Sequence, residues 1–469
     1  MERESKLIIA LMIAVMMGAI DTTIVVLAFL PITKDLHTSF AYSIWVIMVY
    51  LLVLAVGTTQ LGRLGDIFAR KNIFLAGIAV FTVGSALCGA SPGILYLIAF
   101  RVIQGSGAAM IQSNSGAIIA ENFPPNRRGR IFGYTGVGYN AGAMLGIVLG
   151  GFITQFIGWQ FIFYINVPIG AFALWFALRN IKKIEPVGNR LDVPGIVLLA
   201  SGLALISYAS VDLATYGLRL INEIVLAVGA AVIIAMVSVE RKVERPLLPL
   251  KVFRVRVLTF SIFASFFQSL GFLAVAFIVI MYLQGIRGLN PEESSLLLLP
   301  GYVVGSVLGP FFGRLTDRIG SRIPATLGIG IMGISILIYL TLTVHSSFYV
   351  VIFASLVTGV GSSMFFPANN SAVMANSPRE LYGMSSGFLR TMSSIGMLGS
   401  FVVAISVASI NVPRYIAFEV FAGSLQGGVP SGFLVGIKAA LLVSLVILIM
   451  AGILSAFRGK EKRSEIRVK

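Results

Sequence analysis

Apolar runs of about twenty residues recur along the whole chain, and this feature constrains the fold more than any other. A bilayer core of roughly 30 Å is crossed by about 20 helical residues, because in lipid the backbone amides must be satisfied within the helix. Only 12% of the residues are charged, which is too few to cover the surface of a water-soluble protein of 469 residues. The sequence therefore predicts an all-α polytopic membrane protein.

Fourteen such runs predict fourteen transmembrane helices. The first run follows Arg3 and Lys6 but is too long for a signal peptide and lacks a small-residue cleavage pattern, so we expect it to remain as a span. The expected spans are 7–30, 41–61, 73–91, 94–120, 131–155, 160–179, 193–213, 220–239, 257–283, 293–313, 323–343, 347–369, 383–410 and 434–456.

The basic residues gather on one side of these spans. Of the 35 Lys and Arg residues, 28 fall in the two termini and in alternate loops, 5 in the other loops and 2 within spans. The positive-inside rule then predicts a multi-pass protein of the cell (plasma) membrane with cytoplasmic N- and C-termini. Because the charges are spread over short loops that face lipid headgroups, the net charge of +16 does not predict a nucleic-acid partner.

One cytoplasmic segment occurs twice, which indicates an internal repeat. The pattern Gly-Arg-Leu-x-Asp stands at residues 62–66 and again at 313–317, each time with a basic residue shortly after. A Gly-x-Gly pair at 105–107 recurs at 359–361. Two like-oriented halves follow. The predicted organisation is an N-terminal six-helix bundle over 1–190, two inserted transmembrane helices over 191–245 and a C-terminal six-helix bundle over 246–469.

The repeated loop resembles the signature loop of the major facilitator superfamily. Fourteen spans are similar to its drug:proton antiporter branch, which has two extra helices. Further segments resemble motifs of that branch, in the same order along the chain: residues 21–31 in span 1, 101–107 in span 4, the glycines of span 5 and residues 159–170 at the start of span 6. The resemblance implies two six-helix bundles and transport by alternating access.

Asp21 is the carboxylate that the sequence places well inside a span, and a buried acid in a membrane is a candidate proton site. Asp21 lies about 15 Å from the outer end of its helix, and Arg101 in span 4 lies about 13 to 14 Å in. The two side chains could therefore meet, and proton binding would compete with the ion pair. The alternatives are a structural hydrogen bond for Asp21 and a bracing role for Arg101.

The repeated loops suit a cytoplasmic gate. Asp66 and Asp317 are each followed by helix-initiating sequence, so each could bind a helix N-terminus or an arginine of the other bundle when the cytoplasmic side is closed. Alternatively, the loops only set topology by their charge. The predicted gate residues are Gly62, Arg63, Asp66, Arg70, Lys71, Gly313, Arg314, Asp317 and Arg322.

Span 5 carries glycine at every fourth residue, which predicts close helix packing. These residues are Gly138, Gly142, Gly146 and Gly150, with Gly151 beside them, and the family resemblance adds an antiporter-motif role. Candidate residues of a substrate cavity are Gln104, Asn114, Asn140, Phe366 and Arg390, although aromatic residues on spans more often face lipid and Arg390 could snorkel. The external segment from Asn411 to Gly432 is long enough to fold over the outer mouth.

The sequence offers little for an enzyme. It has no phosphate-binding loop of the ATPase type, the two histidines His37 and His345 lack metal-ligand spacing, and Cys88 is a single cysteine. We therefore expect a monomeric secondary exporter of amphipathic or lipophilic small molecules, surrounded by membrane lipids, with no cofactor or metal and the proton gradient as energy source. The alternatives are a metabolite facilitator or symporter, and a non-transporting receptor or lipid-binding protein.

Overall fold

The computed structural model describes residues 2–38, 40–181, 193–217, 219–240, 254–408 and 432–459. These residues form α-helices with short 3-10 and π-helical segments, and no strand occurs among them. Apart from Gly432, the predicted outer segment 411–432 lies outside the described residues, as do both predicted domain boundaries, near 190 and 245.

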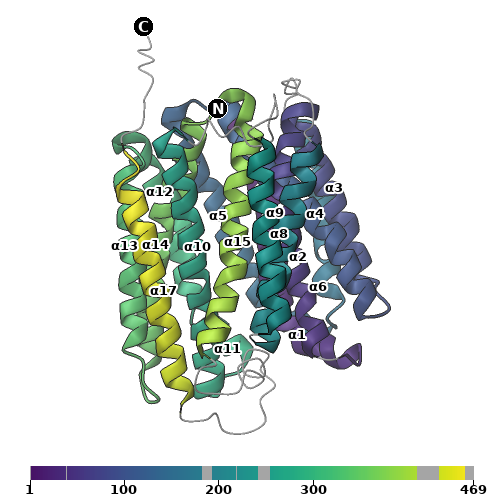
Figure 1. The fold of residues 1–469 in the computed structure, drawn as a ribbon, viewed down its shortest axis with the longest axis vertical. Helices are drawn as coiled ribbons and strands as arrows, with labels where there is room; N and C mark the ends of the chain where they lie inside the picture. Colours follow the sequence, from purple (N-terminus) through teal and green to yellow (C-terminus); the bar gives the residue numbers. More distant parts are fainter. Residues whose placement is uncertain are drawn as a thin grey trace.

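The helices follow one another in an up-and-down order (Figure 1). The first group is α1 (Glu2–Asp35), α2 (Phe40–Phe68), α3 (Arg70–Gly89), α4 (Ile94–Asn122), α5 (Pro125–Phe156), α6 (Phe161–Tyr164) and α7 (Asn166–Asn180). Then come α8 (Val193–Tyr216) and α9 (Leu220–Glu240). The last group is α10 (Arg256–Met281), η2 (Tyr282–Ile286), α11 (Pro291–Leu296), α12 (Leu299–Ile319), α13 (Arg322–Leu340), α14 (Phe348–Ala375), η3 (Arg379–Leu381), α15 (Tyr382–Ala408) and α17 (Phe433–Ala456).

Eleven helices or helix pairs in the described part of the chain are long and apolar enough to cross a membrane. The other three expected spans coincide with α8, α10 and α15, so the count of fourteen stays a prediction. Many large apolar side chains of these helices are exposed, for example Ile234 on α9, Val307 on α12 and Val446 on α17. Lipid tails are the solvent that such a surface requires.

Two of the expected spans are broken near one end, and proline explains both breaks. Pro168 has no N–H to donate to the carbonyl of Tyr164, and α6 ends at Tyr164. In the same way Pro300 cannot donate to Leu296, where α11 ends. Each span therefore consists of a short helix followed by a longer one.

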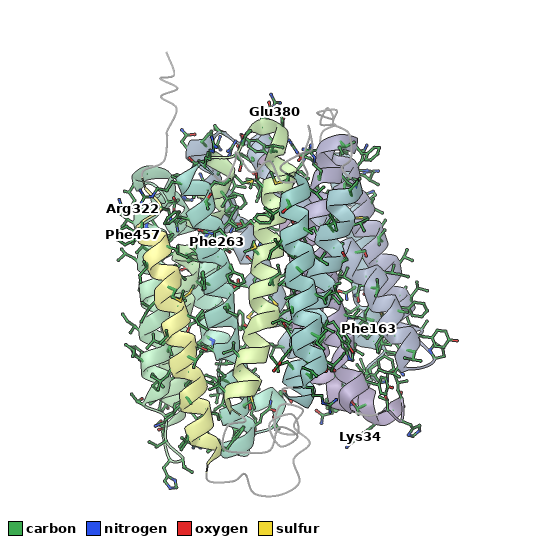
Figure 2. The ribbon with its side chains drawn as sticks, in the orientation of Figure 1. Lys34, Phe163, Phe263, Arg322, Glu380 and Phe457 are labelled. Carbon is green, nitrogen blue, oxygen red and sulfur yellow. The ribbon has the colours of Figure 1, made fainter. Side chains whose placement is uncertain are left out.

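The two ends of the bundle differ in what they carry. The chain begins at the upper end in Figure 1, and Figure 2 places Glu380 and Arg322 at that end and Lys34 at the lower end. We call them the upper and lower ends. The upper end is the one that the distribution of basic residues predicts to be cytoplasmic.

Helices α1–α7 form the first half of the molecule and α10–α17 the second, and the halves meet along two helix pairs. In one pair α2 crosses α15, and a Cβ added at Gly62 would lie 2.2 Å from the carbonyl oxygen of Gly383. In the other pair α5 crosses α12, and a Cβ added at Gly313 would lie 2.4 Å from the oxygen of Gly129. Glycine is therefore required where the backbones touch.

Helices α8 and α9 pack against each other, and α8 also packs against α2 and α15 (Figure 1). They therefore lie over the line where the two halves meet. Leu199 and Leu203 of α8 and Met236 of α9 form a small apolar cluster with Met384 of α15.

Candidate functional site

A buried ion pair joins α1 to α4. Arg101 Nη1 lies 2.6 Å from Asp21 Oδ2, and neither side chain exposes more than 1% of its surface. The sequence placed these two residues at matching depths, and the structure brings them into contact. Because both charges are shielded from water, removing one partner strands the other, which typically costs about 3–5 kcal/mol.

Gln104 binds both members of this pair. Its Oε1 accepts from Arg101 at 2.7 Å, and its Nε2 donates to Asp21 Oδ1 at 2.8 Å. The same Nε2 lies 2.7 Å from the hydroxyl of Ser85 on α3, to which Asn166 of α7 also donates. This polar network is thus built from four helices of the first half of the molecule.

Arg101 has further contacts that hold it in place. Its Nε donates to the carbonyl oxygen of Val46 on α2 at 2.9 Å. Its guanidinium carbon lies 4.3 Å from the ring centre of Tyr50 and 5.8 Å from that of Phe163, which Figure 2 labels. Aromatic faces attract a cation, so the arginine retains partners when the Asp21 carboxylate is neutralised by a proton.

At the upper end of α2, Asp66 caps the N-terminus of α15. Its two carboxylate oxygens accept from the backbone N–H groups of Gly383 and Met384, each at 2.9 Å. The first N–H groups of a helix have no partner within the helix and carry the positive end of its dipole. Asp66 is 1% exposed, so this contact between the halves is shielded from water.

The second copy of the motif makes the matching contact. Asp317, at the upper end of α12, accepts from the N–H groups of Gly129 and Arg130, the fifth and sixth residues of α5, at 2.8 and 2.9 Å. Each half thus binds backbone N–H groups near the start of a helix of the other half, through the aspartate of its own motif copy. This exchange follows the internal repeat seen in the sequence.

The turn after each motif aspartate has the same backbone conformation. Ala69 has φ 76°, and Gly320, at the matching place in the second copy, has φ 91°. A left-handed conformation is easy for glycine, whereas it costs a residue with a Cβ about 1–2 kcal/mol. The first copy therefore contains backbone strain that the second does not.

Arg70 links Asp66 to two residues that sequence reasoning missed, Glu121 and Arg379. Arg70 Nε donates to Asp66 at 2.9 Å, and its two terminal nitrogens reach Glu121 at 2.5 Å and the backbone oxygen of Arg379 at 2.8 Å. The Arg379 side chain also pairs with Glu121. Glu121 could have been found in the sequence, because it is an acid at the end of span 4, where the following loop is basic.

Arg128, which sequence reasoning also missed, joins the ends of α4 and α14. Its guanidinium donates to the carbonyl oxygens of Ala120 and Phe123 at 2.6 and 3.0 Å, and to that of Met374 at 2.8 Å. It also lies over the ring of Tyr382, 5.1 Å from its centre. The cation is therefore placed at the negative ends of two helix dipoles from different halves.

The remaining basic residues of the motif copies make varied contacts. Arg63 is 4% exposed. Arg314 interacts electrostatically with Tyr134 of α5, whose hydroxyl accepts from Arg130 at 3.0 Å.

Lys71 and Arg322 each contact their own half. Lys71 Nζ lies 3.5 Å from the carbonyl oxygen of Leu178 on α7, and Arg322 Nε donates to that of Ala456 at 2.8 Å. Both hydrogen bonds stay within one half, so these two predicted gate residues do not join the halves through them.

The glycine ridge of α5 lies against α1. A Cβ added at Gly138, Gly142 or Gly146 would come within 2.5–2.7 Å of a carbonyl oxygen of α1. Gly150 is also buried, and Gly151 lies next to Glu292 of α11. The two backbones are thus in direct contact over three helical turns.

The five predicted cavity residues occupy two kinds of place. Gln104 and Asn114 are fully buried, Gln104 in the network around Asp21 and Asn114 against the carbonyl oxygen of Leu61 on α2. They therefore line no open space in this conformation. Asn140, Phe366 and Arg390 are partly or largely exposed.

Within the described ranges, no three His, Cys, Asp or Glu side chains gather as they would around a metal ion. The buried acids Asp21 and Asp66 instead contact arginine and backbone or amide N–H groups.

Comparisons with known proteins identify the family. The tetracenomycin C resistance and export protein of Streptomyces glaucescens is 28% identical over 495 residues, which cover 98% of this chain and 92% of that protein. The multidrug resistance protein Stp of Mycobacterium tuberculosis is 30% identical over 383 residues, which cover 80% of this chain and 71% of that protein. The crystal structure of the human organic anion transporter MFSD10 (TETRAN) shares the fold, with a TM-score of 0.66 at 14% identity, over 96% of this chain and 99% of that chain.

A family model described as the Major Facilitator Superfamily matches residues 11–401, which confirms the resemblance seen in the sequence motifs. The chain therefore belongs to the major facilitator superfamily, and is a multi-pass membrane transporter rather than an enzyme.

Proposed function

We propose that the protein exports amphipathic or lipophilic small molecules by alternating access, in exchange for protons bound at Asp21. The ion pair between Asp21 and Arg101 is the observation that carries this proposal. Asp21 is a fully buried acid that binds the Arg101 cation and Gln104. A proton on Asp21 would neutralise it and weaken its bond to Arg101, so proton binding competes with an interaction that holds α1 to α4.

Alternating access is supported by the contacts of Asp66 and Asp317. Both join the halves at the upper end, so access from that end requires both contacts to be broken. The basic residues favour the upper end as the cytoplasmic one, with both termini inside and the protein in the cell membrane. In that orientation this conformation is closed to the cytoplasm, and Asp66 and Asp317 act as the latches of a cytoplasmic gate.

Export is supported by the relatives. One is named a resistance and export protein and another a multidrug resistance protein. We infer that this chain acts in the same direction. A monomer is sufficient for the gate, because each half supplies the gate contacts of the other within one chain. The proton gradient would be the energy source, with no cofactor.

Transport in proteoliposomes tests the proposal. The purified chain is reconstituted, a pH gradient is imposed, and flux of a panel of cationic, neutral and anionic amphipathic compounds is measured. Asp21→Asn should abolish gradient-driven flux while exchange down a concentration gradient continues, since the amide resembles the protonated acid. Glu223→Gln, at the start of α9 and away from the buried network, is the control. Gradient dependence that survives in Asp21→Asn would refute the assignment of the proton site.

The pair should also behave as a unit. Asp21→Asn and Arg101→Ala should be non-additive, because either change alone removes the same ion pair. Additive effects on gradient-driven flux would contradict competition between the proton and the arginine.

A further inference from the structure

An internal space between the halves is indicated by Tyr139 of α5. This residue exposes 42% of its surface, yet groups from three other helices surround it. It interacts electrostatically with Tyr50 of α2, Tyr302 of α12 and Arg390 of α15. Because these neighbours come from both halves, the exposed surface of Tyr139 faces a cleft between the halves and not the lipid.

Arg390 lies in this cleft without a carboxylate partner. It starts the third turn of α15, about 12 Å along the helix from Tyr382. Its Nη2 makes a long hydrogen bond of 3.5 Å to Asn370 Oδ1 on α14, and no carboxylate oxygen of the described residues lies within 4 Å of it. These contacts turn the side chain towards α5 and α14, whereas a snorkelling arginine would extend to the upper end.

The charge that the cleft offers to a cargo is therefore positive. The other charges placed deep in the described spans, Asp21 and Arg101, neutralise each other within the first half and are almost completely buried. A partly exposed arginine within a membrane-spanning helix that contacts no carboxylate of the described residues is costly, and an anionic ligand would supply the missing partner. Asp21 does not attract a cationic cargo in the same way, because Arg101 already neutralises its charge.

The walls next to Arg390 are aromatic. Phe366 of α14 is 40% exposed and lies one helical turn before Asn370, so both residues share a face of the helix. Together with Tyr139 it adds apolar surface beside the cation. We propose that Arg390 is a specificity-determining residue that binds the anionic group of an amphipathic organic anion in the cleft, while Phe366 and Tyr139 contact its apolar body. This inference rests on the proposed export function and names its substrate class.

Equilibrium binding to the purified full chain in detergent tests the inference independently of transport. The probes are radiolabelled 2-naphthaleneacetate and its neutral analogue 2-naphthaleneacetamide, which differ in charge and share the apolar body. Wild type should bind the carboxylate about tenfold more tightly than the amide, the effect of one charge-assisted contact. Arg390→Gln should remove this preference and leave amide binding unchanged.

Two further variants keep the test informative. Arg390→Lys retains the charge and should keep most of the preference, so it serves if Arg390→Gln does not fold. Arg179→Gln is the matched control, because Arg179 stacks on Trp175 of α7 in the first half and is exposed. Displacement of the carboxylate by phosphatidylglycerol and not by phosphatidylcholine would assign the subsite to a lipid headgroup, and displacement by neither would assign it to a soluble anion.

Equal affinity of wild type for the two probes, binding of neither, or an unchanged preference in both Arg390 variants would overturn the inference. Gradient-driven flux of cationic or neutral compounds with no binding of the carboxylate would leave export standing and remove the anionic subsite. Binding of the carboxylate through Arg390 with no gradient-driven flux of any compound would leave the subsite and remove export.

Discussion

Replacing Asp66 by asparagine should shift the molecule away from the conformation that is closed at the upper end. The carboxylate accepts two hydrogen bonds from the first turn of α15 and one from Arg70. The amide has one oxygen, so it can keep one of these bonds as a neutral one and loses the ion pair. Hydrogen bonds to a charged group contribute about 1.5–3 kcal/mol and neutral ones about 0.5–1.5.

We therefore expect the closed conformation to lose about 2–3 kcal/mol relative to the open one. This corresponds to an increase of about 30- to 150-fold in the ratio of open to closed molecules. Folding should be little affected, because the open conformation exposes the same side chain to water.

Cysteine accessibility measures this ratio. Cys88→Ser removes the single cysteine of the chain, and Ser386→Cys introduces a reporter in the first turns of α15, where the wild-type side chain is 4% exposed. The labelling rate with a membrane-impermeant maleimide in inside-out vesicles is proportional to the open fraction while that fraction is small. Asp35→Asn is the matched control, because Asp35 follows Lys34, which Figure 2 places at the lower end, and accepts from Trp159 within the first half.

Asp317→Asn should also raise the labelling rate, and the double variant should show the sum of the two free-energy changes, since the caps share no partner. A labelling rate that stays at the wild-type value in the double variant would refute the gate and reduce both loops to topology signals.

Two backbone positions give further predictions. Gly383→Ala should prevent complete closure and raise Ser386→Cys labelling, because the added Cβ would lie 2.2 Å from the oxygen of Gly62. Gly330→Ala is the control, because its added Cβ meets nothing within 4 Å and should not change the labelling rate. Equal labelling rates in the two variants would contradict this prediction. Ala69→Gly should raise the free energy of unfolding by about 1 kcal/mol in thermal melts by relieving its positive φ, and Gly320→Ala should lower it; no change in either variant would show that the turn is not strained.

The repeat allowed the sequence to predict the class of contact made by Asp66 and Asp317. A carboxylate that ends one helix beside cations suits a helix N-terminus, and duplication implies that the contact occurs twice. The sequence did not indicate which helices receive the caps. The partner helices are determined by the positions of the N-terminal ends of α15 and α5 in the fold. They are also determined by the glycines that let α2 and α12 approach these two helices.

The sequence placed Gln104 in the substrate cavity, but its spacing from Arg101 could have predicted its place beside Asp21. Gln104 stands three residues after Arg101 and therefore on the same face of α4. If Arg101 faces Asp21, Gln104 should face it too. Arg128 had no such signal. Its partners are carbonyl groups at the ends of α4 and α14, and a helix end that is free to bind a cation is visible in the fold and not in the sequence.

Two helices connect the network around Asp21 to the contact of Asp317. These helices, α1 and α5, pack with no side chain between their backbones. Asp21 belongs to α1, whose carbonyl oxygens touch the glycines of α5 over three turns, and Asp317 binds backbone N–H groups in the second turn of α5. Two backbones in direct contact cannot slide independently without opening voids, which are costly in a packed interior. We therefore expect a shift of α1 on breaking the Asp21 pair to displace α5 as well, and hydrogen bonds such as those of Asp317 and Asp66 weaken steeply once the donor and acceptor atoms separate.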